Sequence, residues 1–270
     1  MKNIFFGNIV LGEFNPLAPV SAEPLTHFSI GRWSVVVSNH MFMIAVAALL
    51  LVIVIPLIVR SRKIVPAGPY NLIEAACVLL REQLAMPILG PLTDKFISFI
   101  WTLFFFVLTL NLLGMVPFEK VIVLLTGKEN YYGGAATANI WITGALAITA
   151  FLTSIVAGVK EKGLWKFLVG LAPPVPWWIA PFIYFLEIIT LFIRPLTLAI
   201  RLFANIMAGH MLIGTLLGLI FIFKNYFVAT ASVLTVVALS LLDLLVAFIQ
   251  AYIFAFLSTL YIGFSVKSEH

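Results

Sequence analysis

The chain has 270 residues, of which 63% are hydrophobic and 10% charged, with a net charge of +5 and a mean hydropathy of +1.14. Soluble domains carry about 25% charged residues, so this composition excludes an ordinary soluble protein and predicts a polytopic membrane protein. The single cysteine, Cys77, excludes an internal disulfide and a cysteine metal cluster, and the basic residues lie in short flanks that indicate membrane topology rather than nucleic-acid binding.

The first 38 residues are mixed in character and rich in turn signals, including Pro16, Pro19 and Pro24. We expect an extramembranous arm here, without a clear signal peptide, because the first apolar run is short and interrupted. His40, at the end of the arm, is interpreted as an ordinary polar flank.

Five later segments are apolar and long enough to cross a bilayer as helices. Arg60 and Lys63 directly follow the first, and Lys160 and Lys162 directly follow the third. Because basic residues mark the cytoplasmic side, we expect the N-terminus outside and the C-terminus in the cytoplasm. The predicted spans of this single membrane domain, 39–270, are about 41–59, 96–116, 138–159, 179–221 and 228–263.

The segment of about 69–90 contains Glu74, Arg81 and Glu82 and is too polar to span easily. Its apolar residues fit a helical stripe, which predicts an amphipathic helix on the cytoplasmic surface. A helix that packs on the protein without touching lipid is the alternative. The stripe consists of Leu72, Ala75, Ala76, Leu79 and Leu80.

The last two predicted helices are unusually long. Forty-odd residues at 1.5 Å each give a helix of ~60 Å, whereas the hydrocarbon core is ~30 Å thick. A break at 224–227 separates them. We therefore expect a hairpin of helices that are broken, project from the membrane or lie at a steep slant.

Arg201 stands in the middle of the first of these helices, where a charge costs ~2.5–3.5 kcal/mol on insertion scales. We interpret it as a functional residue facing other helices or water, the alternative being an arginine that snorkels to the interface, as Arg194 could do. At 100° per residue, Glu187, Arg194 and Asn205 lie within about 40° of Arg201, whereas His210 points about 180° away.

If the two helices fold back on each other about the break at 224–227, two residues lie at the same height along the hairpin when their numbers sum to about 451. Arg201 then meets Gln250, and His210 meets Asp243. Tyr261 lies on the same helical face as Asp243 and Gln250. A carboxylate beside a histidine suits an ion path, although the two could also be a structural buried pair. Arginine keeps its proton, so Arg201 is a fixed charge that could block proton leakage or pair with a carboxylate. This chain has no unpaired carboxylate at its level, which indicates a partner outside the chain.

At these residues the chain resembles subunit a of F-type ATP synthase. The matching segments are NLLGMVP at 111–117, TANIWIT at 137–143, LEIITLFIRPLTLAIRLFANIMAGH at 186–210 and LLVAFIQAYIFAFLSTLYI at 244–262. The resemblance covers roughly residues 40–264, and its RLFANxxAGH core is highly specific. The fold that it implies has five transmembrane helices, one amphipathic helix and a slanted hairpin beside a rotating ring of c subunits. The other implied partners are the peripheral-stalk b subunits and the remaining ATP synthase subunits.

The resemblance also implies roles for individual residues. Arg201 matches the essential stator arginine, with Asn205 and Gln250 beside it. His210 and Asp243 match the pair on the entry side, and Glu187 matches an acidic position on the ATP-making side. Positions of possible secondary importance are Asn139, which stands where relatives often have Asp, and Arg194, Asn111 and Tyr261.

The implied mechanism is electrostatic, with no catalytic site, cofactor or metal in this chain. A proton enters from outside past His210 and Asp243, neutralises a ring carboxylate and, after nearly a full turn, leaves near Glu187, while Arg201 prevents a short circuit. The sequence leaves proton and sodium coupling open, because the binding carboxylate lies on another chain. We expect a bacterial plasma membrane, although a mitochondrial inner membrane or a thylakoid also fits.

Two other classes of protein were weighed. A self-contained secondary transporter with midplane charges should have pseudo-symmetric halves, and the sequence contains no internal repeat. An intramembrane enzyme would need a nucleophile with a base, or a metal motif such as HExxH, and the four histidines are not spaced in that way.

Overall fold

The computed structural model of the chain describes residues 24–30, 33–59, 68–116, 118, 133–169, 176 and 178–266. Most of the predicted arm, the basic flank after the first span, most of the predicted external loop and the C-terminal tail lie outside the described residues. The described part is almost entirely helical, and five of its helices are long and apolar enough to cross a membrane. The prediction of an all-α polytopic membrane protein is confirmed.

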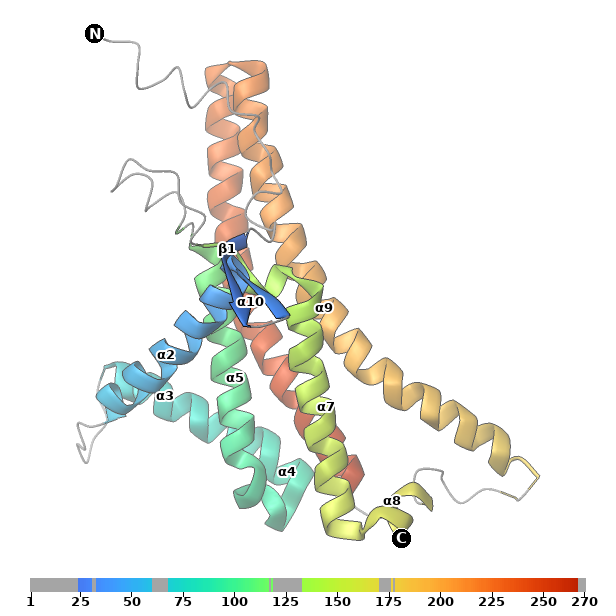
Figure 1. The fold of residues 1–270 in the computed structure, drawn as a ribbon. Coiled ribbons are helices and arrows are strands. Elements are labelled where there is room, and N and C mark those ends of the chain that lie inside the picture. Colours follow the sequence, from blue (N-terminus) through green and yellow to red (C-terminus); the bar gives the residue numbers. More distant parts are fainter. Residues whose placement is uncertain are drawn as a thin grey trace. The chain divides into compact units, whose positions relative to one another are not determined.

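Each predicted span corresponds to a helix in the structure (Figure 1). The helix bounds differ from the predicted ones by up to three residues, apart from the amphipathic segment described below. The spanning helices are α2 (Asn39–Val59), α5 (Thr93–Met115), α7 (Ile140–Lys162), α9 (Ala180–Phe223) and α10 (Tyr226–Val266). Shorter helices are α3 (Pro69–Val78), η2 (Leu79–Ala85), α4 (Met86–Leu89), η3 (Gly90–Leu92), η4 (Ala136–Ala138) and α8 (Leu164–Val169).

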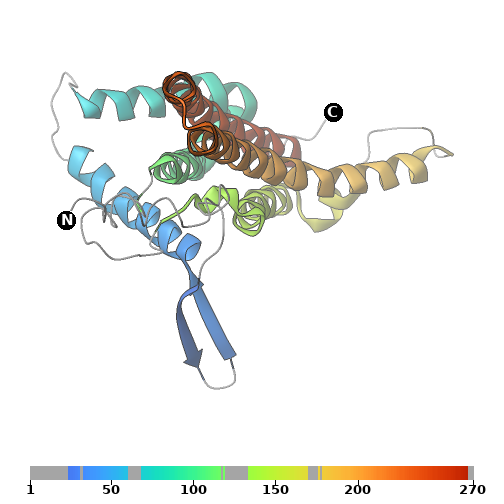
Figure 2. The same ribbon diagram turned by 90° about the horizontal axis from the view of Figure 1, so that it is seen from above.

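A β-hairpin precedes the first span and was not predicted (Figure 2). Strand β1 (Pro24–Ile30) pairs antiparallel with β2 (Trp33–Ser38), and α2 begins at the next residue. The segment WSVVVS is rich in β-branched and aromatic residues, which favour strands. The hairpin was not predicted, because the prolines of this segment were interpreted as turn signals.

The chain divides into two compact units, and the long helices run through both. The first unit comprises Met1–Ile44, Leu110–Asn139 and Phe203–Phe248. It contains the β-hairpin, the end of α5, the η4 segment and the halves of α9 and α10 nearest their turn. The second unit comprises Ala45–Thr109, Ile140–Leu202 and Ile249–His270.

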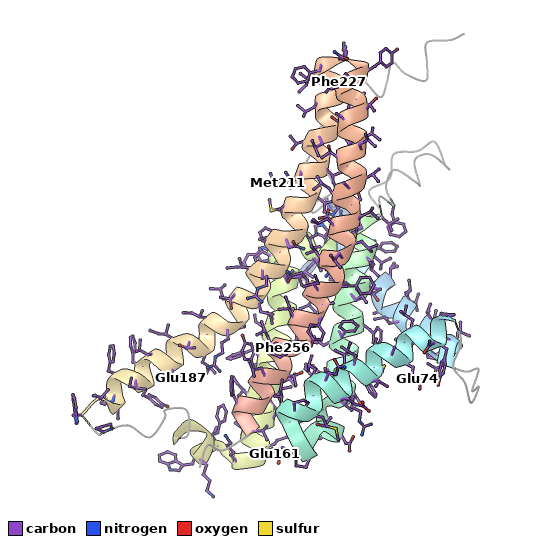
Figure 3. All side chains as sticks on the ribbon, turned by 180° about the vertical axis from the view of Figure 1, so that it is seen from behind. Glu74, Glu161, Glu187, Met211, Phe227 and Phe256 are labelled. Carbon is purple, nitrogen blue, oxygen red and sulfur yellow. The ribbon has the colours of Figure 1, made fainter. Side chains whose placement is uncertain are left out.

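In the first unit, α9 and α10 run antiparallel side by side from their turn (Figures 1 and 3). Lys224 adopts a positive φ of 46° there, and the Asn225 side chain accepts a hydrogen bond of 2.9 Å from the Phe227 N–H. Two residues outside the helices therefore suffice to reverse the chain, and the predicted hairpin is present.

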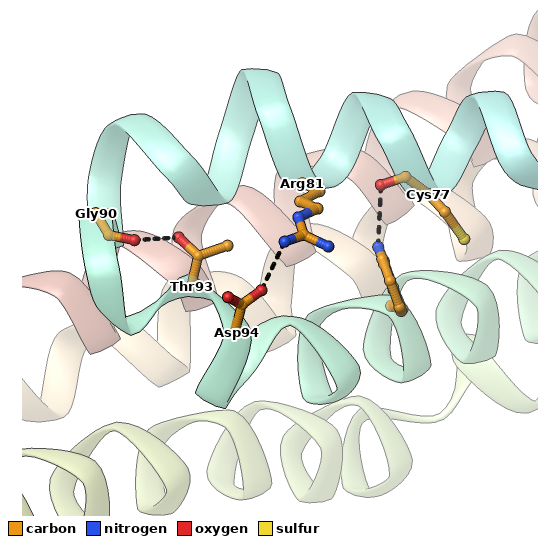
Figure 4. Close-up of polar contacts among 6 residues, drawn as sticks. Cys77, Arg81, Gly90, Thr93 and Asp94 are labelled. Atoms are coloured by element: carbon orange, nitrogen blue, oxygen red, sulfur yellow. Dashed lines mark hydrogen bonds and ion pairs between the residues drawn. The ribbon is translucent and has the colours of Figure 1, made fainter.

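In the second unit, the predicted amphipathic segment is a continuous run of α, π and α turns that ends at Gly90 (Figure 4). Gly90 has a φ of +60°, which suits glycine, and its carbonyl accepts a 2.7 Å hydrogen bond from Thr93 at the start of α5. Arg81 pairs with Asp94 at 2.7 Å, and the Trp101 indole donates to the Cys77 carbonyl at 3.1 Å. These contacts hold the segment against α5.

Only one residue of the predicted apolar stripe, Leu80, is buried within the protein; Leu72 and Leu79 are exposed. The residues that pack inward lie further along, at Leu84 and Leu89 among others. The exposed part of the stripe remains available for lipid, and the surface location of this helix stays a prediction.

In the second unit, the C-terminal end of α7 lies close to the short helix α8 and to the C-terminal end of α10. A Cβ atom on Gly158 would lie 2.6 Å from the Phe167 ring and 2.9 Å from the Ser265 carbonyl oxygen. An ion pair between Lys95 and Glu161 joins α5 to α7. A small residue at position 158 therefore permits this packing, as is common where membrane helices meet.

Candidate functional site

The residues predicted to carry function lie on α9 and α10 and fall in both units. Asn205, His210 and Asp243 belong to the first unit, whereas Arg201 and Gln250 belong to the second. Each group is described by itself below.

In the second unit, Arg201 is exposed, whereas the neighbouring Leu198 and Leu202 are buried. Leu198 and Leu202 are thus turned into the protein, whereas Arg201 is turned away from it together with exposed apolar residues such as Ile200. Arg201 makes no ion pair with any carboxylate in the described part of the chain. The interpretation of Arg201 as a functional residue that faces other helices or water stays a prediction.

Gln250 is half-buried in the same unit. No hydrogen bond joins it to Arg201 among the described residues, and the predicted match in height stays a prediction. Tyr261 lies beside Arg194.

Arg194 is held on both sides rather than snorkelling freely. Its guanidinium pairs with Glu187 at 2.9 Å, and its carbon Cζ lies 5.6 Å from the Tyr261 ring centre and 5.9 Å from that of Phe264. Positively charged groups over aromatic faces are attracted at such distances. The seven-residue spacing of Glu187 and Arg194, two helical turns, was the sequence signal for this pair.

In the first unit, Asp243 lies directly against Gly209. A Cβ on Gly209 would stand 2.7 Å from the Asp243 Oδ2 atom, so only glycine leaves room for the carboxylate. The numbers 209 and 243 sum to 452, close to the predicted register. His210 is therefore next to the residue that faces Asp243, but no direct hydrogen bond joins His210 to Asp243 within the described residues.

Asn205 is half-buried on α9, and the following turn packs through Ile206 against Ala135 and Ala138. This contact places the η4 segment beside α9. Asn139, at the end of that segment, lies 3.2 Å from the His40 ring, measured from Nδ2 to Nδ1.

His40 is fully buried, so its interpretation as an ordinary polar flank is wrong. The Asn139 contact and the close fit of Gly209 were also missed. A buried histidine next to an apolar run has no sequence signal of its own, because its partner is 99 positions away. Asn111, named as a secondary candidate, is fully buried on α5.

A profile of the ATP synthase A chain family matches residues 40–263, which covers α2 to α10 and both groups of polar residues. The chain belongs to the ATP synthase A chain family. The resemblance suggested by the RLFANxxAGH segment is thereby confirmed. The alternative of a self-contained secondary transporter is not supported.

Individual relatives agree with the family profile. ATP synthase subunit a of Chloroherpeton thalassium is 34% identical over 97% of this chain and 76% of its own length. The subunit a of Myxococcus xanthus is 38% identical over 96% of this chain and 82% of its own. That of Anaeromyxobacter dehalogenans is 37% identical over 86% of this chain, which spans only 58% of that relative.

Family membership and the five apolar helices together make this chain an integral membrane subunit of ATP synthase. Its work is proton transport in ATP synthesis, and its partners include other subunits of the complex.

Proposed function

We propose that this chain is the stator subunit that guides protons through two aqueous half-channels to a ring of c subunits, with Arg201 as the fixed charge between them. The observation that carries the proposal is the exposed guanidinium of Arg201 in an apolar helix, unpaired with any described carboxylate. A bare charge at the membrane centre is too costly to keep without a counter-ion or water.

The counter-ion is a carboxylate of the c-ring. Leu198, Ala199 and Leu202 pack inward, so the opposite face of α9 is open to a partner at the level of Arg201. A deprotonated ring carboxylate is attracted to the guanidinium, and a protonated one is not. Each ring carboxylate is therefore deprotonated when it reaches Arg201. It leaves Arg201 only on the side where a proton is available to neutralise it.

The outer half-channel passes His210 and Asp243. The Asp243 carboxylate lies against the backbone at Gly209, next to the His210 imidazole, a side chain that can carry a proton. The absence of a direct bond between the two within the described residues favours transfer through intervening water over a closed structural pair.

The inner half-channel passes Glu187. Arg194 fixes the position of this carboxylate at 2.9 Å, and the rings of Tyr261 and Phe264 fix Arg194 in turn. The arrangement gives protons leaving the ring a defined acceptor on the other side of Arg201.

The proposed setting is a bacterial plasma membrane, as for the bacterial relatives, with the N-terminus outside and the C-terminus in the cytoplasm. The exposed apolar residues of α9 and α10 then face lipid or the c-ring, and the b subunits of the peripheral stalk complete the stator.

The test is ATP-driven proton pumping by the reconstituted complex. Arg201→Ala is expected to abolish pumping, because the proposal assigns the separation of the half-channels to this charge and to no other in the described part of the chain. Arg81→Gln is the matched control: it also removes an arginine, but one that is paired with Asp94 away from the proposed path. Wild-type pumping by the Arg201→Ala complex would overturn the proposed role.

A further inference from the structure

A second group of polar side chains is buried in the first unit, away from the Gly209–Asp243 contact. His40 at the start of α2, Asn111 on α5 and Thr137 in η4 each have an exposed fraction of 0%. They come from three separate stretches of the chain.

Contacts within the unit bring the three stretches together. Asn139 Nδ2 lies 3.2 Å from His40 Nδ1, which joins the end of the η4 segment to α2. A Cβ on Gly114 would lie 3.1 Å from the Ala135 Cβ, so α5 packs tightly on the same segment. Asn111 precedes Gly114 by three residues, about one turn, and thus lies on the same side of α5.

The cluster also adjoins the proposed outer half-channel. Ala135 and Ala138, which flank Thr137, pack against Ile206 of α9. Ile206 follows Asn205 directly and stands about one turn before Gly209, the residue that faces Asp243.

Four polar atoms of this cluster have no hydrogen-bond partner within the described part of the chain: His40 Nε2, Asn111 Nδ2, Asn111 Oδ1 and Thr137 Oγ1. Buried polar groups in proteins are almost always satisfied, by protein or by ordered water. Several such atoms in one place meet the requirement for buried water, which needs two to four polar partners.

We propose that His40, Asn111 and Thr137 line a water-filled vestibule of the outer half-channel, and that His40 carries protons in it. The proposal rests on the proposed function of the chain. The vestibule extends the path from Asp243 past Ile206 to the first residues of α2.

The chemistry at His40 involves only N–H bonds. Nε2 accepts a proton from one vestibule water and returns it to another, so the ring ends in its starting state. With the Asn139 amide turned over, its Oδ1 accepts from Nδ1–H of both the neutral and the charged ring, which leaves Nε2 of the neutral ring free to accept the proton. The other ionisable groups described in this unit, His210, Lys224, Tyr226 and Asp243, make no hydrogen bond or ion pair with His40 within the described chain.

The first experiment tests whether the vestibule is wet. In assembled complexes carrying Cys77→Ser, the variants Asn111→Cys and Thr137→Cys should react with a charged, water-soluble methanethiosulfonate at least several-fold faster than two controls. The controls, Met43→Cys and Leu110→Cys, are buried apolar neighbours on α2 and α5. Equal rates at all four positions would show a dry cluster and overturn the proposal.

The second experiment tests proton carriage by His40. His40→Gln keeps a hydrogen-bonding side chain that does not titrate. It should slow ATP-driven pumping per assembled complex by about tenfold, less than the ~10² typical of a positioned proton carrier because water shares the path. Pumping at the wild-type rate in His40→Gln, with a loss only in His40→Leu, would mean a structural role and contradict the proposal.

The two failures are distinguishable. If Arg201→Ala abolishes pumping but His40→Gln does not slow it, only the vestibule proposal falls. If Arg201→Ala pumps normally, the proposed function itself falls.

Discussion

At the scale of single residues, the account depends on which charges are paired and which are not. Arg194 has Glu187 at 2.9 Å and two aromatic rings near its guanidinium, whereas Arg201, two turns later on the same helix, is exposed and unpaired within the described chain. The same side chain therefore serves as a structural clamp at one position and as a free charge at the other.

The contact of Asp243 with Gly209 leads to a residue-scale prediction. Gly209→Ala places a methyl carbon only 2.7 Å from the present position of the Asp243 Oδ2 atom. A carboxylate is the mobile end of its side chain, so we expect it to rotate aside while the helices stay in place. Pumping should fall several-fold in a complex that assembles normally, as measured per assembled complex.

A double variant supplies the control. In an Asp243→Ala background the carboxylate is gone, so adding Gly209→Ala should have no further effect on pumping. Equal additional losses with and without the carboxylate would show that the methyl group acts elsewhere.

The sequence predicted individual residues where their signal was local. The charge in an apolar run identified Arg201, and the helical repeat placed Glu187 and Arg194 on one face. His40 was misread because its burial depends on Asn139, far away along the chain. Periodicity shows which residues share a face with Arg201 and not what covers that face, so the partner of Arg201 stays a prediction.

At the scale of elements, the hairpin of α9 and α10 has a definite register. We expect Gly209→Cys with Asp243→Cys, in a Cys77→Ser background, to form a disulfide readily, because the two positions are in contact. Gly209→Cys with Thr235→Cys should not, because position 235 lies eight residues, ~12 Å, further along α10. Crosslinking of the second pair alone would contradict the register.

The approach of α7 to α8 and α10 gives a further prediction. Gly158→Ala brings a methyl group to 2.9 Å from the Ser265 carbonyl oxygen, a backbone atom that has no rotamer to change. Overpacking of this kind costs about 1–3 kcal/mol, so the thermal stability of the purified subunit should fall.

Gly144→Ala on the same helix is the matched control, since an added Cβ there meets nothing within 4 Å. It should leave thermal stability unchanged or slightly raised, as alanine favours helix. Equal destabilisation by both variants would contradict the packing explanation, because helix propensity favours alanine at both positions.

The elements themselves were largely predictable, because five apolar runs of spanning length have few alternatives in a membrane. The end of the helix at Gly90 and the π turns of η2 were not predictable. They lie where Arg81 pairs with Asp94 and Thr93 donates to the Gly90 carbonyl, contacts that have no sequence signal. The β-hairpin before α2 was not predicted because Pro16, Pro19 and Pro24 were interpreted as turn signals, although Pro24 is the first residue of β1.

At the scale of the whole molecule, the chain is an ATP synthase subunit a by family, and the family match extends from His40 to Gly263. Most residues in the apolar stretches of α9 and α10 are not buried within the chain. Only 11% of the apolar stretch of each helix is buried, against 50% for the apolar stretch within Pro69–Met115. Such apolar helices need lipid or other subunits around them. The proposed function supplies both, with the c-ring meeting Arg201.

The central claim is that Arg201 keeps two proton paths apart, and passive proton flux tests it most directly. Vesicles carrying the complex stripped of its catalytic sector are given a potential, and proton uptake is recorded for wild type and Arg201→Ala. The account predicts passive flux at or above the wild-type rate in Arg201→Ala, in the same preparation that has lost ATP-driven pumping. Loss of both fluxes in an assembled complex, or retention of coupled pumping, would contradict it.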